Sequence, residues 1–157
     1  MLYQRSHTAM YASQINYFTE DIFFTLPKKA VVTSWLQHVI VAENAVLGYL
    51  NFIFCSDHYL HAHNVQYLQH DTLTDVITFD YRETTNVLEG EIYISIPRVR
   101  ENAATYQVPF LQELHRVMAH GVLHLLGYQD KTSEDQAIMR GKEDSCLALY
   151  ERVVTDG

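Results

Sequence analysis

Near its C-terminal end the chain carries two histidines four residues apart, with a glycine and a carboxylate shortly after them. His120 and His124 belong to the segment HGVLHLLGYQD, which Gly127 and Asp130 complete. Residues four apart in an α-helix project from the same face, so both imidazoles can reach one ion. A glycine can adopt the left-handed conformation that ends a helix, and the chain can then turn back and offer Asp130 as a third ligand. The segment therefore predicts a metal site with a fourth position open to water, as in catalytic zinc sites.

The helix predicted to carry the histidines, from about Phe110 to Leu126, is apolar on nearly every side. A polar group buried without a hydrogen-bond partner costs about 1–3 kcal/mol, so imidazoles on such a helix need a partner or a metal ion. A lone histidine here would more often be a hydrogen-bonded core residue, but a pair with Gly127 and Asp130 at these offsets favours metal binding. His115 lies on another face of the helix and is either a packing residue or a further imidazole near the site.

Gly121 follows the first histidine, in the interior of the predicted helix. Glycine costs about 1 kcal/mol there relative to alanine, which indicates that something needs the space. In zinc peptidases with an HExxH helix the same position holds the general-base glutamate, although the spacing otherwise resembles the extended metzincin motif. Without that glutamate, peptide hydrolysis lacks its proton shuttle, and the sequence argues against a protease.

Hydrophobic periodicity predicts strands in the first part of the chain and a run of helices after Pro97. The expected strands cover about Ile15 to Phe18, Val46 to Phe54, Thr74 to Phe79 and Gly90 to Ser95. The expected helices run from about Pro27 to Ala42, Ser56 or Asp57 to Leu68, Pro97 to Ala104, Phe110 to Leu126, and Ser133 to Tyr150. This order indicates an α+β fold, with a small four-stranded mixed sheet covered by about five helices and the metal site on a helix of the C-terminal half. At 157 residues and 48% hydrophobic, the chain suits one domain over residues 1–157.

Charge, cysteine content and hydropathy limit the classes of function. A formal net charge of −8 argues against a broad basic surface, so a nucleic-acid partner must bind at a local patch. Cys55 and Cys146 are far apart and outside any CxxC pattern, which suits a reducing compartment. No apolar run approaches the ~20 residues that span a bilayer, and residues 1–11 have no signal-peptide core. We therefore expect a cytoplasmic protein without a membrane partner.

Three segments resemble the bacterial YbeY-like endoribonucleases of ribosomal RNA maturation. The family's hallmark helix reads HGxLHLxGYDH, and this chain has HGVLHLLGYQD. Upstream, DTLTDVITF at residues 71–79 is similar to the family's D-x-P-T-D-V-L-S-F segment, and GEIYIS at residues 90–95 is similar to its G-D-I-x-I-S strand. Together with their flanks, the matches span roughly residues 64–143.

The resemblance implies a zinc-dependent endoribonuclease that cleaves single-stranded RNA, holds one Zn²⁺ ion, and acts in 16S rRNA 3′-end maturation and ribosome quality control. Its partners would be the 16S rRNA precursor and the ribosome or its small subunit. The family's metal ligands carry over onto His120, His124 and Asp130. The family usually has a third histidine at the last position, preceded by an aspartate where this chain has Gln129. A carboxylate oxygen is also a zinc ligand, and its charge should make the ion a weaker Lewis acid.

A second departure from the family concerns the cation that stabilises the phosphate. The family usually has an arginine after its tyrosine, and here Leu68 follows Tyr67. Phosphodiester cleavage builds negative charge on the phosphate, which a guanidinium or ammonium normally stabilises. Another cation must therefore take this role, or the activity is weak. The candidates for substrate binding are Lys131, Arg116 and Arg98, with Arg140 as a further cation near the motif, although each is more often a solvated surface charge.

The expected nucleophile is a metal-bound water, because a bound zinc ion lowers the pKa of water toward 7 and polarises a phosphoryl oxygen. The sequence identifies no dedicated general base. Asp75, Glu91 and Glu143 are carboxylates close to the family-like segments, with a strand turn or a surface position as the ordinary explanation for Asp75 and Glu143. Two alternatives stay open: a metallohydrolase of another substrate, including peptides, and a ribosome-associated binding protein whose ion is structural.

Overall fold

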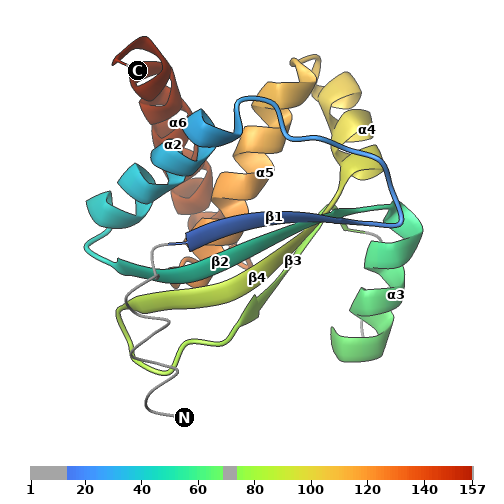
Figure 1. Cartoon of the computed structure of the whole chain (residues 1–157), viewed down its shortest axis with the longest axis horizontal. Coiled ribbons are helices and arrows are strands. Elements are labelled where there is room, and N and C mark those ends of the chain that lie inside the picture. Colours follow the sequence, from blue (N-terminus) through green and yellow to red (C-terminus); the bar gives the residue numbers. More distant parts are fainter. Residues whose placement is uncertain (1–13, 69–73, 157) are drawn as a thin grey trace.

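A computed structural model describes residues 14–68 and 74–156, in which one mixed sheet carries helices on both of its faces (Figure 1). The strands are β1 (Gln14–Glu20), β2 (Val46–Cys55), β3 (Val76–Asp80) and β4 (Val87–Ser95). They lie in the order β1-β2-β4-β3, with β1 and β4 parallel to β2 and β3 antiparallel to β4. The predicted α+β fold with a four-stranded mixed sheet is thereby confirmed within the described residues.

The helices in the described part of the chain are α2 (Lys29–Ala42), α3 (Asp57–Leu68), α4 (Ile96–Tyr106), α5 (Phe110–Leu125) and α6 (Ser133–Asp156). Figure 1 shows α2, α5 and α6 on one side of the sheet and α3 on the other, with α4 next to α5. None of these helices has an apolar stretch long enough to cross a membrane.

Predicted and observed element ends agree closely, and the main differences lie in β4 and α6. β4 begins at Val87 rather than at Gly90, because in the sheet the backbone before the glycine still pairs with β2. α6 continues to Asp156 rather than ending at Tyr150, since Val153 still packs against the core. In both cases tertiary contacts extend an element beyond its local sequence signal.

The main core lies between the sheet and the helices α2, α5 and α6. Successive side chains of a strand point to opposite faces, so alternate residues of β2 and β4 turn toward these helices. Fully buried side chains of this core include Trp35, Leu50, Phe52, Ile92, Ile94 and Leu114. On the opposite face, α3 covers a smaller cluster formed by Cys55, Leu60 and Ile77. The sheet therefore supports α5 through the main core on one face, while α3 packs against the other face.

Gly121 explains how closely α5 approaches the sheet. A Cβ atom at this position would lie 2.8 Å from Cγ2 of Ile92 in β4, a distance that real Cβ atoms essentially never show. The sequence-based expectation that the space is needed is confirmed, and the neighbour is the sheet. The position that holds the glutamate of an HExxH peptidase therefore faces the core here.

Candidate metal centre

The two histidines of the motif lie one helical turn apart near the end of α5. The rings of His120 and His124 have centroids 4.6 Å apart and planes at 79°, so each presents a different edge to the same space. Their side chains keep 22% and 24% of their surface exposed, which leaves the imidazoles reachable from solvent. α5 thus places the two imidazoles at the boundary between core and surface.

A tight turn after α5 brings Asp130 back to the histidines. Gly127 has φ +111°, a left-handed conformation that glycine adopts without strain. Its N–H donates to the carbonyl of His124, and the N–H of Tyr128 donates to the carbonyl of Leu123, each at 3.0 Å. These are the two bonds of a Schellman motif, which reverses the chain at a helix end. The predicted role of the glycine is confirmed.

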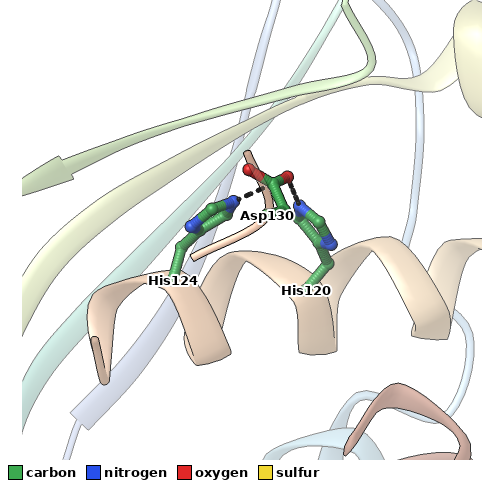
Figure 2. A group of neighbouring side chains, drawn as sticks. All are labelled: His120, His124 and Asp130. Atoms are coloured by element: carbon green, nitrogen blue, oxygen red, sulfur yellow. Dashed lines mark hydrogen bonds and ion pairs between the residues drawn. The ribbon is translucent and has the colours of Figure 1, made fainter. Parts of the chain in front are cut away.

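The three predicted ligands converge on one point (Figure 2). Oδ2 of Asp130 lies 3.3 Å from Nε2 of His120 and 3.2 Å from Nε2 of His124. Their donor atoms all lie within 4.8 Å of one another, and the described part of the chain contains no other such group of histidine, cysteine or acidic residues. Two imidazole nitrogens and a carboxylate oxygen form a donor set that zinc accepts. The residues therefore fit one metal ion, while ligation itself stays a prediction.

Glu143 of α6 contacts the first histidine from the side away from Asp130. Its Oε2 lies 2.6 Å from Nδ1 of His120, and because an ionised carboxylate can only accept, this nitrogen carries the proton. Arg116 donates to the other oxygen of Glu143 at 3.0 Å and to Asp144 at 2.9 Å. Burial opposes ionisation of the Glu143 carboxyl, but the bonds from His120 and Arg116 hold its pKa below the usual value.

A cleft of about 310 Å³ opens beside His120 and Asp130. Its wall includes Asp75 and Glu113, and burial raises the pKa of both carboxyls. Asn102 donates to Asp75 at 3.2 Å and fixes that side chain in the wall. A substrate entering the cleft therefore meets the candidate metal site in an environment rich in carboxyl groups.

The structure separates the cations that the sequence offers for substrate binding. Arg116 lines the cleft but is bound to two carboxylates, as described above. Arg98 pairs with Asp57 at 2.8 Å, and neither it nor the exposed Lys131 lies among the described lining residues. Arg140 does line the cleft. Substrate binding by Lys131, Arg116 and Arg98 is not tested by these positions and stays a prediction.

Other residues singled out in the sequence take structural positions or lie outside the description. His115 is buried between the rings of Trp35 and Tyr150, and burial lowers its pKa to about 4, so it is a packing residue rather than part of the site. The side chains of Tyr67 and Leu68, and residues 71–73 of the family-like segment, lie outside the described residues.

Sequence reasoning missed the contacts that hold the turn bearing Asp130. Tyr128 donates its hydroxyl proton to Glu43, just after α2, at 2.5 Å, and Lys142 of α6 donates to the same carboxylate at 2.9 Å. Gln136 of α6 also donates to the backbone carbonyl of Asp130 at 3.1 Å. Separations of 85 and 99 residues leave no local signal for the first two contacts. The third ligand is thus positioned by elements distant in the chain.

The family model and the curated relatives that match this chain carry one family name. The family model described as Endoribonuclease YbeY matches residues 14–151. An endoribonuclease YbeY from Amoebophilus asiaticus is 58% identical over 142 residues, covering 90% of this chain and 96% of the relative. One from Flavobacterium psychrophilum is 51% identical over 133 residues, covering 85% and 94%. A solution structure of a Thermotoga maritima protein is similar with a TM-score of 0.60 and 28% identity, covering 87% of this chain and 88% of that one.

Proposed function

The chain belongs to the endoribonuclease YbeY family, and on this basis we propose that it is a zinc-dependent enzyme that cleaves single-stranded RNA. We place this activity in 16S rRNA 3′-end maturation and in ribosome quality control. The observation that carries the proposal is the convergence of His120, His124 and Asp130 beside a cleft of about 310 Å³. A metal-dependent hydrolase needs such a meeting of ligands and substrate space.

In this proposal His120, His124 and Asp130 hold a single Zn²⁺ ion. Nε2 of each imidazole and Oδ2 of Asp130 are the atoms that would hold it. When bound, zinc supplies a Lewis acid and an activated water, which is the chemistry that phosphodiester hydrolysis needs. Three protein ligands leave room for that chemistry, whereas a closed structural site has four.

The hydrogen bond to Glu143 determines which nitrogen of His120 is available to bind the ion. Because the proton of the imidazole sits on Nδ1 and is shared with the Glu143 carboxylate, Nε2 keeps its lone pair. The same hydrogen bond makes the imidazole a stronger electron donor. Arg116 keeps the carboxylate charged and in place, so Glu143 and Arg116 act together as positioning residues.

The cleft suits a single RNA strand better than a broad duplex surface. The chain has a formal net charge of −8, so a phosphate backbone can be accepted only locally. Burial raises the pKa of Asp75 and Glu113 in the wall, so these carboxyls give up their charge more readily than exposed ones. Their repulsion of a phosphate is correspondingly weaker.

We place the reaction in the cytoplasm, on the 16S rRNA precursor carried by the ribosome or its small subunit. Residues 1–157 would act as a single metal-dependent endoribonuclease domain. The core position of Gly121 disfavours a peptidase, because the general-base glutamate of such enzymes has no room there.

The deciding experiment compares RNA and protein substrates with purified, zinc-loaded protein. A labelled single-stranded RNA, the same RNA as a duplex, a 16S rRNA precursor and casein are each incubated with and without a chelator. We expect chelator-sensitive cleavage of the single strand and of the precursor only. His120→Ala should reduce cleavage by about 100-fold or more, because it removes one of the three proposed ligands. Loss of an outer hydrogen-bond partner of a ligand already costs about 10- to 100-fold, and loss of the ligand itself should cost more.

The matched control is His38→Ala, which changes an exposed histidine on α2 and should leave cleavage unchanged. If wild-type protein cleaves neither RNA, or if the His120→Ala protein cleaves as fast as wild type, the proposed function is wrong. Cleavage of casein instead would identify a metallohydrolase of peptides.

A further inference from the structure

One face of α6 is directed at the candidate metal site. Gln136, Met139, Arg140 and Glu143 all line the cleft, and their spacing of three and four residues places them on one side of a helix. Gln136 donates to the carbonyl of Asp130 at 3.1 Å, and Glu143 accepts from His120 at 2.6 Å. Arg140 lies four residues after the first of these contacts and three before the second. Arg140 therefore lies in the same cleft wall as His120 and Asp130.

Arg140 differs from Arg116 in having its charge available. Arg116 is 17% exposed and binds both Glu143 and Asp144. Arg140 is exposed, and it forms no ion pair within 4.0 Å with any residue of the described ranges 14–68 and 74–156. Of the two arginines in the described wall, Arg140 is the one whose guanidinium is not paired with a described carboxylate and so can bind a ligand.

The other charges around the cleft define what that ligand must be. The described wall includes the carboxyl groups of Asp75, Glu113, Asp130 and Glu143, which repel an anion when they are ionised. An anionic substrate needs at least one compensating cation beside the metal, and a guanidinium binds phosphate through two parallel N–H bonds.

We propose that Arg140 binds a non-bridging phosphate oxygen of the RNA strand that enters the cleft. The inference rests on the proposed function and adds to it the residue that holds the substrate backbone. Arg116 is then a partner of Glu143 rather than a substrate contact. Lys131 and Arg98 are not among the described lining residues of this cleft.

The test measures RNA binding by Arg140→Ala, Arg140→Lys and Arg152→Ala proteins. Arg152 is an exposed arginine on the same helix, roughly 18 Å further along its axis, and serves as the matched control. Fluorescence anisotropy follows a short labelled single-stranded RNA at several salt concentrations. The protein is kept free of metal with EDTA so that the RNA stays intact.

We expect Arg140→Ala to weaken binding about tenfold and to reduce the slope of log K against log salt by about 0.7, the value for one lost phosphate contact on a single strand. Arg140→Lys should keep the slope, because it keeps the charge, but bind more weakly than wild type. Arg152→Ala should match wild type. Zinc stoichiometry and melting temperature should be unchanged in all three variants, which separates a substrate contact from a structural role.

Equal affinity and equal salt slope in Arg140→Ala and Arg152→Ala would overturn the inference. Cleavage by the zinc-loaded wild type, measured in parallel, separates this failure from that of the proposed function. If wild type cleaves RNA and Arg140→Ala binds normally, only the inference is wrong. If wild type binds RNA through Arg140 but does not cleave it, only the proposed reaction is wrong. If wild type neither binds nor cleaves RNA, both are wrong.

Discussion

Glu143 shows how far the chemistry of a single residue depends on its neighbours. In the sequence it is one of 19 acidic residues, and an exposed place on a helix is its ordinary explanation. In the structure it is 5% exposed and lies between an imidazole and a guanidinium. A buried carboxylate is tolerated only when its oxygens are hydrogen-bonded, and both of them are. Its position ties the protonation of His120 to the packing of α6 on α5.

We expect Glu143→Ala to weaken zinc binding by about 10- to 100-fold, the usual cost of removing an outer hydrogen-bond partner of a metal ligand. Glu143→Gln should weaken it less, because the amide oxygen can still accept from Nδ1. Asp144→Asn is the matched control, since Asp144 binds the same guanidinium at its exposed end. Competition with a chelator gives the zinc affinities. Equal affinity in Glu143→Ala and Asp144→Asn would show that Glu143 does not position His120.

At the scale of elements, the packing of α5 against the sheet determines where the two histidines lie. The helix approaches β4 closely because Gly121 has no side chain to hold it away from Ile92. At its end, the turn at Gly127 is held by Tyr128 through Glu43. Helix position and turn therefore fix both sides of the candidate metal centre.

Two glycine-to-alanine substitutions distinguish the close packing of α5 on β4 from the intrinsic helix propensity of alanine. Gly121→Ala should lower the free energy of unfolding by about 1–3 kcal/mol, because the new methyl group overpacks against Ile92. Gly141→Ala, in an exposed part of α6 with no atom within 4 Å of the new Cβ, should raise it by up to about 1 kcal/mol. Urea denaturation measures both changes.

A double-mutant cycle sharpens the comparison, since Ile92→Ala removes the contacting atoms and should shrink the cost of Gly121→Ala. A stabilising effect of Gly121→Ala in the otherwise unchanged chain would contradict the close approach of α5 to β4.

At the scale of the whole molecule, the core and the candidate metal centre are largely separate sources of stability. The main core joins the sheet to α2, α5 and α6 through buried apolar side chains. The candidate ligands lie at its boundary, with Asp130 in a loop and 39% exposed. We therefore expect the protein to fold through its apolar core without an ion, in contrast to domains that fold only with zinc.

Zinc removal should therefore lower the melting temperature without unfolding the protein. With free zinc at 100 times its dissociation constant, the expected decrease on chelation is about 5–10 °C, and far-UV circular dichroism at 25 °C should not change. The His120→Ala protein, as control, should melt at the same temperature with and without chelator. Loss of helical signal on chelation would instead support a structural ion, the alternative of a binding protein.

Local sequence was enough to predict the elements and the three candidate ligands that meet in the structure. Strand alternation, helical periodicity and the glycine of the turn are short-range properties, and His120, His124 and Asp130 lie within eleven residues, so one helix end brings them together. The resemblance of the motif indicated the family from the same residues. These features depend only on backbone geometry over a few neighbouring residues, so they can be read from each short segment of sequence alone.

Only the tertiary structure decided what surrounds those ligands. Gly121 packs against Ile92, a strand residue 29 positions earlier in the chain. Tyr128 donates to Glu43, 85 positions away, and Glu143 contacts His120 across 23 positions. It also distinguished Arg116, bound to carboxylates, from Arg140, whose charge faces the cleft free of any ion pair to the described residues. Whether a charge is neutralised depends on which helices pack together, and that is a property of the folded chain as a whole.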